Sequence, residues 1–236
     1  MTTGTSAFSA FVSAAVCACV GHLAGAQPIV YTARNGGNTA YCGVPGSGPL
    51  VSHSFATPTA TDDPISLNSP DGPSSASSHL IAAPSAGGIT LTQSGAANRS
   101  AGGVYATGDA RDNWTFTLTT PTCFALSASL DTTSSSGVAF CNFSISTSNG
   151  RFDLVNGSQV QGFTQTLLAP GSMSLQASGT MQPGTYGLTL AGRTEGNNVL
   201  TFSGTFSNSF VLTIGACGPV CDPVDFNGDG LFPDTQ

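Results

Sequence analysis

The sequence predicts an all-β protein, an antiparallel β-sandwich of jelly-roll or immunoglobulin-like type, and three observations lead to this prediction. Short segments alternate apolar and polar residues with a period of two, which places successive side chains on opposite faces of a strand. Turn-forming Gly, Pro and Asn residues separate these segments at intervals of roughly 8–12 residues, as in sandwiches. After the first 26 residues, no segment shows the sustained 3.6-residue periodicity of a capped helix.

The composition is poor in charged residues and rich in uncharged polar ones. Charged residues make up only 7% of the 236 residues, far below the usual quarter or so, whereas hydrophobic residues make up 39% and are enough for a core. The chain has no Lys and a formal net charge of −7. Surfaces built mainly from the uncharged polar residues Thr, Ser and Asn are common in extracellular β-proteins. Its five scattered Arg residues form no basic patch, so neither nucleic acid nor an anionic membrane surface is an expected partner.

Residues 1–26 are predicted to be a secretory signal peptide with a signal helix. The apolar stretch SAFSAFVSAAVCACVGHLAGAQ contains the small residues Ala24-Gly25-Ala26, and cleavage before Gln27 fits the A-x-A-like rule. A buried helix or a membrane anchor is the alternative, since no Lys or Arg precedes the stretch. The run is short and is followed by Gly and Pro, which favours export. We therefore expect a secreted or cell-surface protein with no membrane span after cleavage.

Residues 27–100 contain short apolar runs between Pro, Gly, Ser and Asp. The runs PIVYTA, PLVSHSF, HLIAA and GITLTQ are each predicted to be a strand. The segment from Ala56 to Ser78 is rich in Pro, Ser, Asp and Thr, and we expect a long surface loop there with at most one short strand. The reason is that Pro donates no ladder hydrogen bond and does not fit a central strand. A linker between two domains is less favoured, because too few residues precede it for a separate core.

From Gly102 onwards the alternation is clear. Strands are predicted around Trp114–Leu118, Phe124–Leu130, Phe140–Ser146 and Phe210–Thr213. The motif Pro-Gly-[Ser/Thr]-x-x-Leu occurs twice, from Pro170 and from Pro183, and predicts a turn followed by a strand. Asn-Gly pairs at Asn149-Gly150 and Asn156-Gly157 are further hairpin indicators.

Five cysteines follow the signal peptide, and in an oxidising compartment all are disulfide candidates: Cys42, Cys123, Cys141, Cys217 and Cys221. Cys123 and Cys141 lie on successive predicted strands, and a disulfide between them would stabilise the domain by about 3 kcal/mol. Cys42 and Cys217 are a second candidate pair, which would tie the start of the domain to its end. Because five is an odd number, either one thiol is free or its partner lies outside the chain.

The last twelve residues, DFNGDGLFPDTQ, space oxygen ligands as a calcium loop does. Positions 1, 3 and 5 are Asp225, Asn227 and Asp229, Gly230 follows at the sharp turn, and Leu231 offers its carbonyl. Calcium takes six to eight oxygens at roughly 2.3–2.6 Å, and alternate residues of a tight loop can all point inward. The D-x-N-x-D-G string is specific enough to predict a calcium site, with an Asx-rich turn as the alternative.

The segment CGPVCDPVDFNGDGLF resembles the start of a dockerin-type repeat, in particular the variant introduced by Gly-Cys or Cys just before the loop. The resemblance covers residues 215–236, under a tenth of the chain. It implies a calcium-folded docking module with a cohesin-like or cell-surface anchoring partner, and no enzyme activity. It also implies that Asp225, Asn227, Asp229 and the Leu231 carbonyl are calcium ligands.

Three departures from this repeat lead us to expect an incomplete loop over residues 216–236. Gln236 stands at position 12, where a bidentate acid is normal, and Asp234 at position 10 is its candidate substitute. The exiting helix and the second repeat are absent. We expect such a loop to bind calcium weakly or not at all by itself, because it lacks charge and preorganisation. The expectation is a fragment or a truncated gene, with Cys221 pairing beyond residue 236.

No catalytic motif of the serine-elbow or zinc type occurs in the chain. The two histidines after the signal, His53 and His79, lie in Ser/Pro-rich surroundings, and the sparse acids are typical of turns and caps. Trp114, Tyr105 and Tyr186 are candidates for an aromatic platform that binds sugar rings, although a Trp in an alternating strand is more often core.

We therefore expect a secreted, non-enzymatic β-sandwich over residues 27–215, structural or adhesive in role and anchored through the dockerin-like module. The first alternative is a carbohydrate-binding module for polysaccharide, which an exposed Trp114 would support and a buried one would oppose. The second is a jelly-roll hydrolase, which a cleft with His53 or His79 beside a carboxylate would support.

Overall fold

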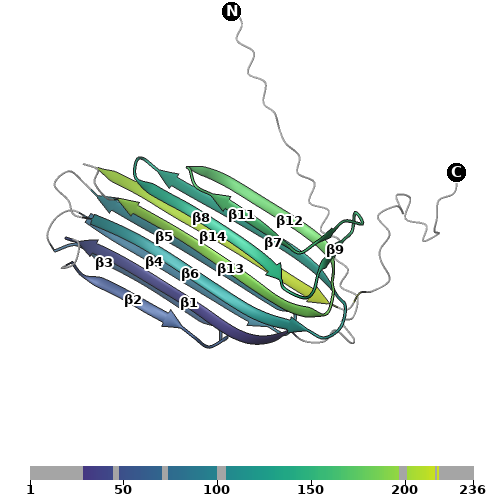
Figure 1. The fold of residues 1–236 in the computed structure, drawn as a ribbon. Coiled ribbons are helices and arrows are strands. Elements are labelled where there is room, and N and C mark those ends of the chain that lie inside the picture. The colour runs from purple at the N-terminus through teal and green to yellow at the C-terminus, as the bar shows by residue number, and fades with distance from the viewer. Residues whose placement is uncertain are drawn as a thin grey trace, which may run out of the picture.

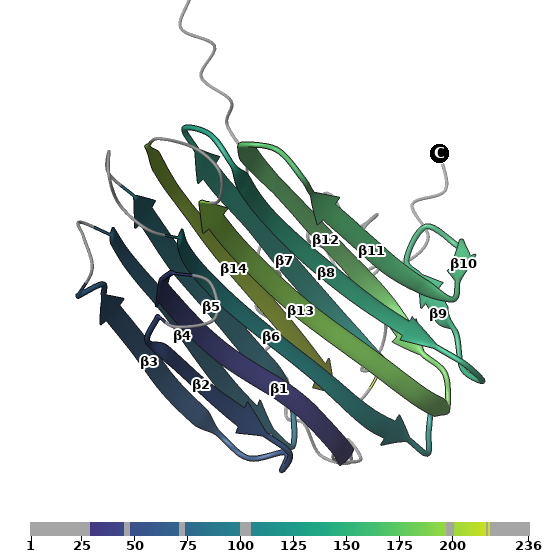
Figure 2. The same ribbon diagram turned by 60° about the vertical axis from the view of Figure 1, so that its left-hand side comes forward.

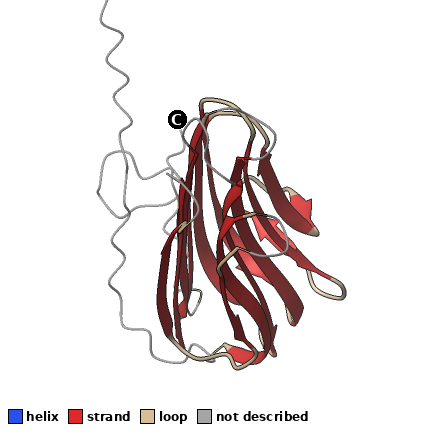
Figure 3. Cartoon of the chain, turned by 90° about the vertical axis from the view of Figure 1, so that its left-hand side faces the viewer, coloured by secondary structure: helices blue, strands red, loops and turns tan. Residues whose placement is uncertain are grey.

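The computed structural model describes residues 29–44, 48–70, 74–99, 105–196, 201–215 and 217, which form two antiparallel β-sheets packed face to face (Figure 1, Figure 3). These described residues contain no helix. The predicted all-β sandwich is therefore confirmed. The signal helix expected within residues 1–26 and the calcium loop expected after Cys217 lie outside the described residues.

Fourteen strands in the described part of the chain make up the two sheets. Sheet A has the order β11-β8-β13-β6-β1-β2, and sheet B has the order β10-β9-β12-β7-β14-β5-β4-β3. The strand bounds in chain order are β1 Val30–Gly43, β2 Leu50–Phe55, β3 Thr61–Asn68, β4 Ser74–Ser85, β5 Gly88–Arg99, β6 Tyr105–Leu118, β7 Thr122–Ser134, β8 Val138–Thr147, β9 Phe152–Leu154, β10 Gln159–Val160, β11 Gly162–Leu167, β12 Gly171–Met181, β13 Gly184–Gly196 and β14 Phe202–Gly215.

Successive strands repeatedly cross from one sheet to the other. The strands β5 to β8 and β11 to β14 interleave, so that β12-β7-β14-β5 in sheet B packs against β11-β8-β13-β6 in sheet A. This is the strand order of a jelly roll, in which two Greek keys share two sheets. The strands β1 and β2 extend sheet A and β4 and β3 extend sheet B along one side, while the β9–β10 hairpin extends sheet B on the other side (Figure 2).

Alternate side chains from both sheets build the core. The predicted apolar face of β8 is buried at Cys141, Phe143 and Ile145, as the period of two requires. Phe143 stacks on Phe210 of β14 in the opposite sheet, with ring centroids 5.0 Å apart. Burying one such Phe side chain contributes about 1.5–3 kcal/mol, so these inter-sheet contacts are a main source of stability.

The segment Ala56–Ser78 contains more strand than predicted. It holds all of β3 and the first residues of β4, so the expectation of a long loop with at most one short strand is wrong. Pro64 fits into β3 because this is the edge strand of sheet B, where a missing N–H donor costs no ladder bond. The inward-facing Ile65 and the half-buried Leu67 supply its apolar face.

The turn motifs behave as predicted in three of four places. Strands β12 and β13 begin at Gly171 and Gly184, which are the glycines of the two predicted Pro-Gly corners. Asn156-Gly157 forms the β9–β10 hairpin, where Gly157 has φ 83° and the Leu154 N–H donates to the Ser158 carbonyl at 2.8 Å. Asn149-Gly150 is not a hairpin turn, because it connects β8 in sheet A to β9 in sheet B.

A buried ion pair lies in the core beneath β1 and β6. Arg34 donates from Nε to Asp112 Oδ1 at 2.9 Å and from Nη2 to Asp112 Oδ2 at 2.7 Å, and the side chains are 0% and 1% exposed. Its guanidinium lies between two aromatic rings, with the ring centroid of Phe55 at 4.9 Å and that of Trp114 at 4.6 Å. Nη1 also donates to the Thr59 carbonyl at 3.0 Å, which fastens the crossover between β2 and β3.

The chain enters and leaves the sandwich at the same end of the molecule. The Ile29 N–H donates to the Ala86 carbonyl at 3.1 Å, and the Ile214 N–H donates to the neighbouring Gly87 carbonyl at 2.8 Å. We call this end, with Ile29, Ala86, Gly87, Ile214 and Cys217, the proximal end. The opposite end, where β1 and β13 finish and β6 starts, is the distal end.

Candidate functional site

A cluster of aromatic and charged side chains lies on the outer face of sheet A at the distal end. We call it the distal patch, and it consists of Tyr41 from β1, Tyr105 and Asp109 from β6, and Arg193 and Glu195 from β13. The strand register brings these residues together, because Thr107 on β6 pairs with both Tyr41 and Glu195 and Asp109 pairs with Arg193. Alternation then turns them all outward, since their chain neighbours Ala40, Ala106 and Thr194 are buried.

The two tyrosines of the distal patch are held in place by their hydroxyl groups. Their ring centroids are 5.5 Å apart with an edge-to-face angle of 61°. The Tyr41 hydroxyl donates to the Val44 carbonyl and accepts from the Gly48 N–H at 3.3 Å. The Tyr105 hydroxyl accepts from Arg193 Nη2 at 3.4 Å, and Arg193 also forms an ion pair with Glu195. The patch is therefore preorganised, and its side chains need little ordering to bind a ligand.

Partial burial shifts the titration of these groups. Burial raises the pKa of Asp109, and the positive charges of Arg193 and Arg111 oppose this only in part. Burial and a hydrogen bond to Glu195 raise the pKa of Tyr105. Burial alone would lower the pKa of Arg193, but the Tyr105 hydroxyl and the Glu195 charge outweigh it and raise the pKa. Arg193 thus stays cationic and Tyr105 stays neutral at physiological pH.

The arrangement suits a neutral, polar ligand. Two acids, Asp109 and Glu195, balance two arginines, Arg111 and Arg193, so the region carries no formal net charge. The half-exposed Tyr rings offer an apolar face together with a polar edge, which is the combination that partly polar ligands need. An anionic ligand would lie close to two carboxylates here, so we do not expect the patch to select negatively charged ligands.

The predicted aromatic platform of Trp114, Tyr105 and Tyr186 does not form. Trp114 is 1% exposed and packs against Tyr31, and Tyr186 is 0% exposed and stacks on Phe116. Both belong to the core, because they lie on the inward faces of β6 and β13. Of the three residues, Tyr105 alone reaches the surface. A buried Trp114 is the result that the sequence analysis named as evidence against a carbohydrate-binding module.

Sequence reasoning predicted Tyr105 as a site residue and missed the other four members of the distal patch, Asp109, Arg193, Glu195 and Tyr41. Tyr41 is the one whose orientation the sequence indicated. It follows Ala40 and precedes Cys42, both 0% exposed, so the pattern Thr39, Tyr41 against Ala40, Cys42 marked it as outward-facing. That signal is short and lies among Gly and Asn residues. Its meeting with Tyr105 depends on the β1–β6 register, which the sequence does not state.

Each of the two described histidines lies beside a carboxylate, on opposite faces of β3. His53 Nδ1 is 2.7 Å from Asp63 Oδ1, and His79 Nε2 is 2.6 Å from Asp62 Oδ1. Asn38 also donates to Asp63 Oδ2 at 2.9 Å. Among the described residues, each imidazole forms its hydrogen bond with the carboxylate alone. A histidine beside a carboxylate is one of the two features named for the alternative of a hydrolase, and a cleft around the pair is the other.

The cysteines pair differently from both predictions. Cys123 forms a disulfide with Cys217, a partner 94 residues away. Cys141 and Cys42 are buried free thiols, so the expected pairs Cys123–Cys141 and Cys42–Cys217 are wrong. Burial raises the pKa of Cys141 to about 12 and also raises that of Cys42, which keeps both thiols protonated and unreactive. Cys221 lies outside the described residues.

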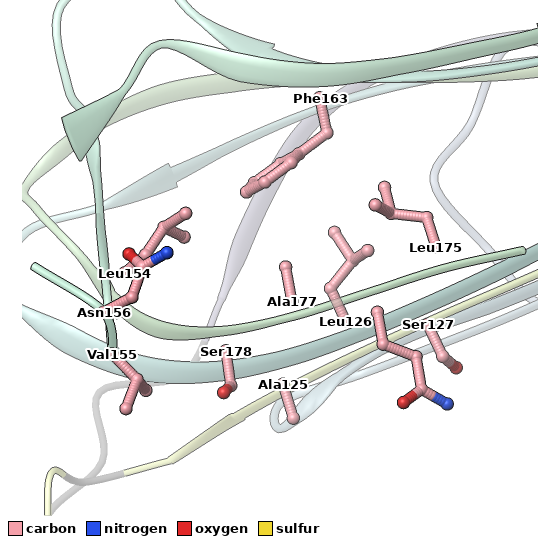
Figure 4. A pocket seen from close by; sticks show the side chains of 11 residues that line it. Ala125, Leu126, Ser127, Leu154, Val155, Asn156, Phe163, Leu175, Ala177 and Ser178 are labelled. Carbon is pink, nitrogen blue, oxygen red and sulfur yellow. The ribbon is translucent and has the colours of Figure 1, made fainter. Parts of the chain in front are cut away.

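An apolar gap opens between the two sheets beside β11 and β12. Phe163 of β11 faces Leu126 of β7 and Leu175 and Ala177 of β12 across it, with Leu154 at one side (Figure 4). The cavity has a volume of about 780 Å³. We call it the edge gap. Its lining carries no charged residue, so it offers packing surface and no evident chemistry.

The predicted calcium ligands Asp225, Asn227, Asp229, Leu231 and Asp234 all lie outside the described residues. Over the described ranges themselves, no group of three or more His, Cys, Asp or Glu side chains is placed to hold a metal ion. The same part of the chain has no helix long and apolar enough to cross a membrane.

Comparison with known proteins adds no family. No protein-family model matches the chain, and no curated protein sequence matches it significantly.

Proposed function

We propose that the chain is a secreted, non-enzymatic β-sandwich with a structural or adhesive role, tethered at its proximal end through the dockerin-like segment after Cys217. The observation that supports this most is the separation of the two ends. The chain leaves the sandwich at the proximal end, and the distal patch lies at the opposite end of sheet A. A tether at one end leaves the other end free to meet a partner.

The Cys123–Cys217 disulfide supports a tether at this position. Cys217 follows β14, which lies between β7 and β5 in the interior of sheet B. Tension on the segment after Cys217 passes through the disulfide to β7 as well as along β14, so two paired strands resist it together. Disulfides are typical of proteins that fold in oxidising compartments, so this bond also supports export.

Calorimetric titration with calcium tests the tether. We compare this chain with a version that has Glu in place of Gln236 followed by a fused exiting helix, since these supply the missing acid and preorganisation. The completed version is expected to bind calcium tightly and this chain weakly or not at all. Asp225→Ala in the completed version should abolish binding, whereas Asp222→Ala, which lies before the loop, should not. Absence of binding by the completed version would refute the dockerin-like assignment.

The distal patch favours polysaccharide binding as a second candidate function. Two half-exposed tyrosines, locked in place beside a balanced set of charges, suit a neutral sugar surface. Affinity electrophoresis against a panel of neutral polysaccharides tests it. Tyr41→Ala and Tyr105→Ala should each weaken retardation, and Thr115→Ala, on the same face but towards the proximal end, should not. Equal mobility of all variants on every polysaccharide would remove this candidate.

A further inference from the structure

The two sides of the sandwich differ in how their strand edges are protected. On one side, β2 and β3 are the edge strands, and they carry His53 and the run Asp62, Asp63, Pro64. Charged side chains and Pro at an edge are the usual means by which β-proteins prevent another strand from pairing there. That side is therefore protected against association.

The other side has edges without such protection. β12 pairs with β7 over its whole length but with β9 only from Gly179 to Met181, and the Ser178 carbonyl accepts from the Val155 N–H at 3.2 Å, so residues 171–177 of β12 have no strand on their second side among the described residues. In the same part of the molecule, β11 has β8 as its one pairing partner among the strands that the structure describes. Between Gln159 and Gln182 the sequence contains no charged residue, and the Pro at position 170 lies before β12 begins.

Apolar side chains are exposed along this unprotected side. Met173 of β12 is 37% exposed and Leu168, in the β11–β12 turn, is 76% exposed. The edge gap opens next to them, with Phe163 and Leu175 on its two walls. Unpaired backbone groups beside uncovered apolar side chains form the surface that an added strand satisfies.

We propose that a second copy of this chain covers this side, with β12 of one copy pairing antiparallel to β12 of the other across a twofold axis. Such an isologous contact joins the two B sheets into one and brings the two edge gaps together. Although each chain has a net charge of −7, the contact strands are uncharged and no like charges meet across the axis. The pairing thus gains backbone hydrogen bonds and apolar burial with no electrostatic cost at the contact.

The chain's own last segment fits this edge poorly. Residues 218–236 contain Pro219, Pro223 and Pro233 and four Asp residues. Pro interrupts a hydrogen-bond ladder, and Asp is depleted in strands. A second β12 has neither, so the second copy is the better occupant.

Sedimentation of the full chain at concentrations between roughly 1 µM and roughly 1 mM, the range of weak to moderate affinity, tests the proposal. A monomer–dimer equilibrium is expected. Ser174→Lys, which adds an exposed charge on β12 that repels its symmetry mate, should weaken dimerisation about tenfold or more. The matched control is Ser66→Lys, an exposed Ser on the protected edge strand β3, and it should leave the equilibrium unchanged.

Hydrogen exchange gives a second readout. The β12 amides that face away from β7 should exchange fast at concentrations where the chain is a monomer and slowly where it is a dimer. A monomer throughout the concentration range, or equal effects of Ser174→Lys and Ser66→Lys, would overturn the proposal. Protection of those amides in the monomer would also overturn it, since the chain itself would then cover the edge.

Discussion

The ion pair between Arg34 and Asp112 should dominate the response of the core to mutation. Asp112→Asn keeps the size of the side chain but removes the charge that compensates a guanidinium that is 0% exposed. Leaving one member of a buried pair uncompensated typically costs about 3–5 kcal/mol. For a domain of this size, about 1 kcal/mol shifts the melting temperature by roughly 2–4 °C, so we expect a decrease of roughly 6–20 °C.

The double replacement Arg34→Met with Asp112→Leu separates the charge from the packing. Both charges are then gone, and well-packed apolar substitutes for buried pairs are often neutral or stabilising. The double variant should therefore melt closer to the wild type than Asp112→Asn does, even though it changes more atoms. Part of the gain is offset, because the Thr59 carbonyl and the Thr61 hydroxyl lose the donor that lies 3.0 and 2.6 Å away.

Gly36→Ala perturbs the same pair without touching either charge. A Cβ at position 36 would lie 2.4 Å from Asp112 Oδ1, so the carboxylate has to move away from Arg34. Gly37→Ala is the matched control, since its Cβ would meet only the His53 carbonyl, at 3.4 Å. Urea unfolding followed by Trp114 fluorescence measures all four variants. A loss of less than about 1 kcal/mol for Asp112→Asn, the range of an exposed pair, would refute this account of the core.

Three further predictions follow from burial and connectivity. Cys123→Ser should lower stability by up to about 4–5 kcal/mol, the chain-entropy value for a loop of this length, and reduction of the wild type should reproduce the loss while leaving Cys123→Ser unchanged. Burial raises the pKa of Tyr186 and of Tyr31 to about 12, so stability should be constant below about pH 10 and fall between about pH 10 and 12, by roughly 3 kcal/mol for the fully buried Tyr186. Ultraviolet titration of the folded protein should find that Tyr31 and Tyr186 ionise only near pH 12, and their ionisation near pH 10 would contradict the prediction. Burial raises the pKa of Asp109, so the folded state loses stability as pH rises above the ordinary Asp range, and Asp109→Asn should melt higher than the wild type at pH 7 but not at about pH 3.

The strands that the sequence predicted best are those whose alternation is continuous. β6 around Trp114 and β8 around Phe143 carry apolar residues at every second position, so both their existence and their buried face were predictable. β3 was missed because only Ile65 and Leu67 mark its inner face, while Pro and Asp suggested a loop. An edge strand needs few apolar residues, since it covers only the margin of the core.

The candidate site was less predictable, because it depends on contacts between distant segments. Tyr41 and Tyr105 meet through the register of β1 with β6, and Cys123 meets Cys217 because Gly215 pairs with Cys123 across β14 and β7. The sequence contains the residues of these contacts but not the order of strands within a sheet. The predicted pair Cys123–Cys141 was plausible by proximity in the chain, yet β7 and β8 belong to different sheets.

The adjacent carbonyls of Ala86 and Gly87 hold the first and the last residues of the sandwich next to each other. Because the chain enters and leaves the domain at adjacent points, inserting the domain into a longer polypeptide would add almost nothing to the distance between the segments before and after it. The long axis of the domain can then extend away from the flanking segments. A short Gly-Ser bridge from Cys217 back to Ile29, with new termini opened in a distal loop, should give a circular permutant that folds, and that rearranged protein would carry its attachment point at the opposite pole.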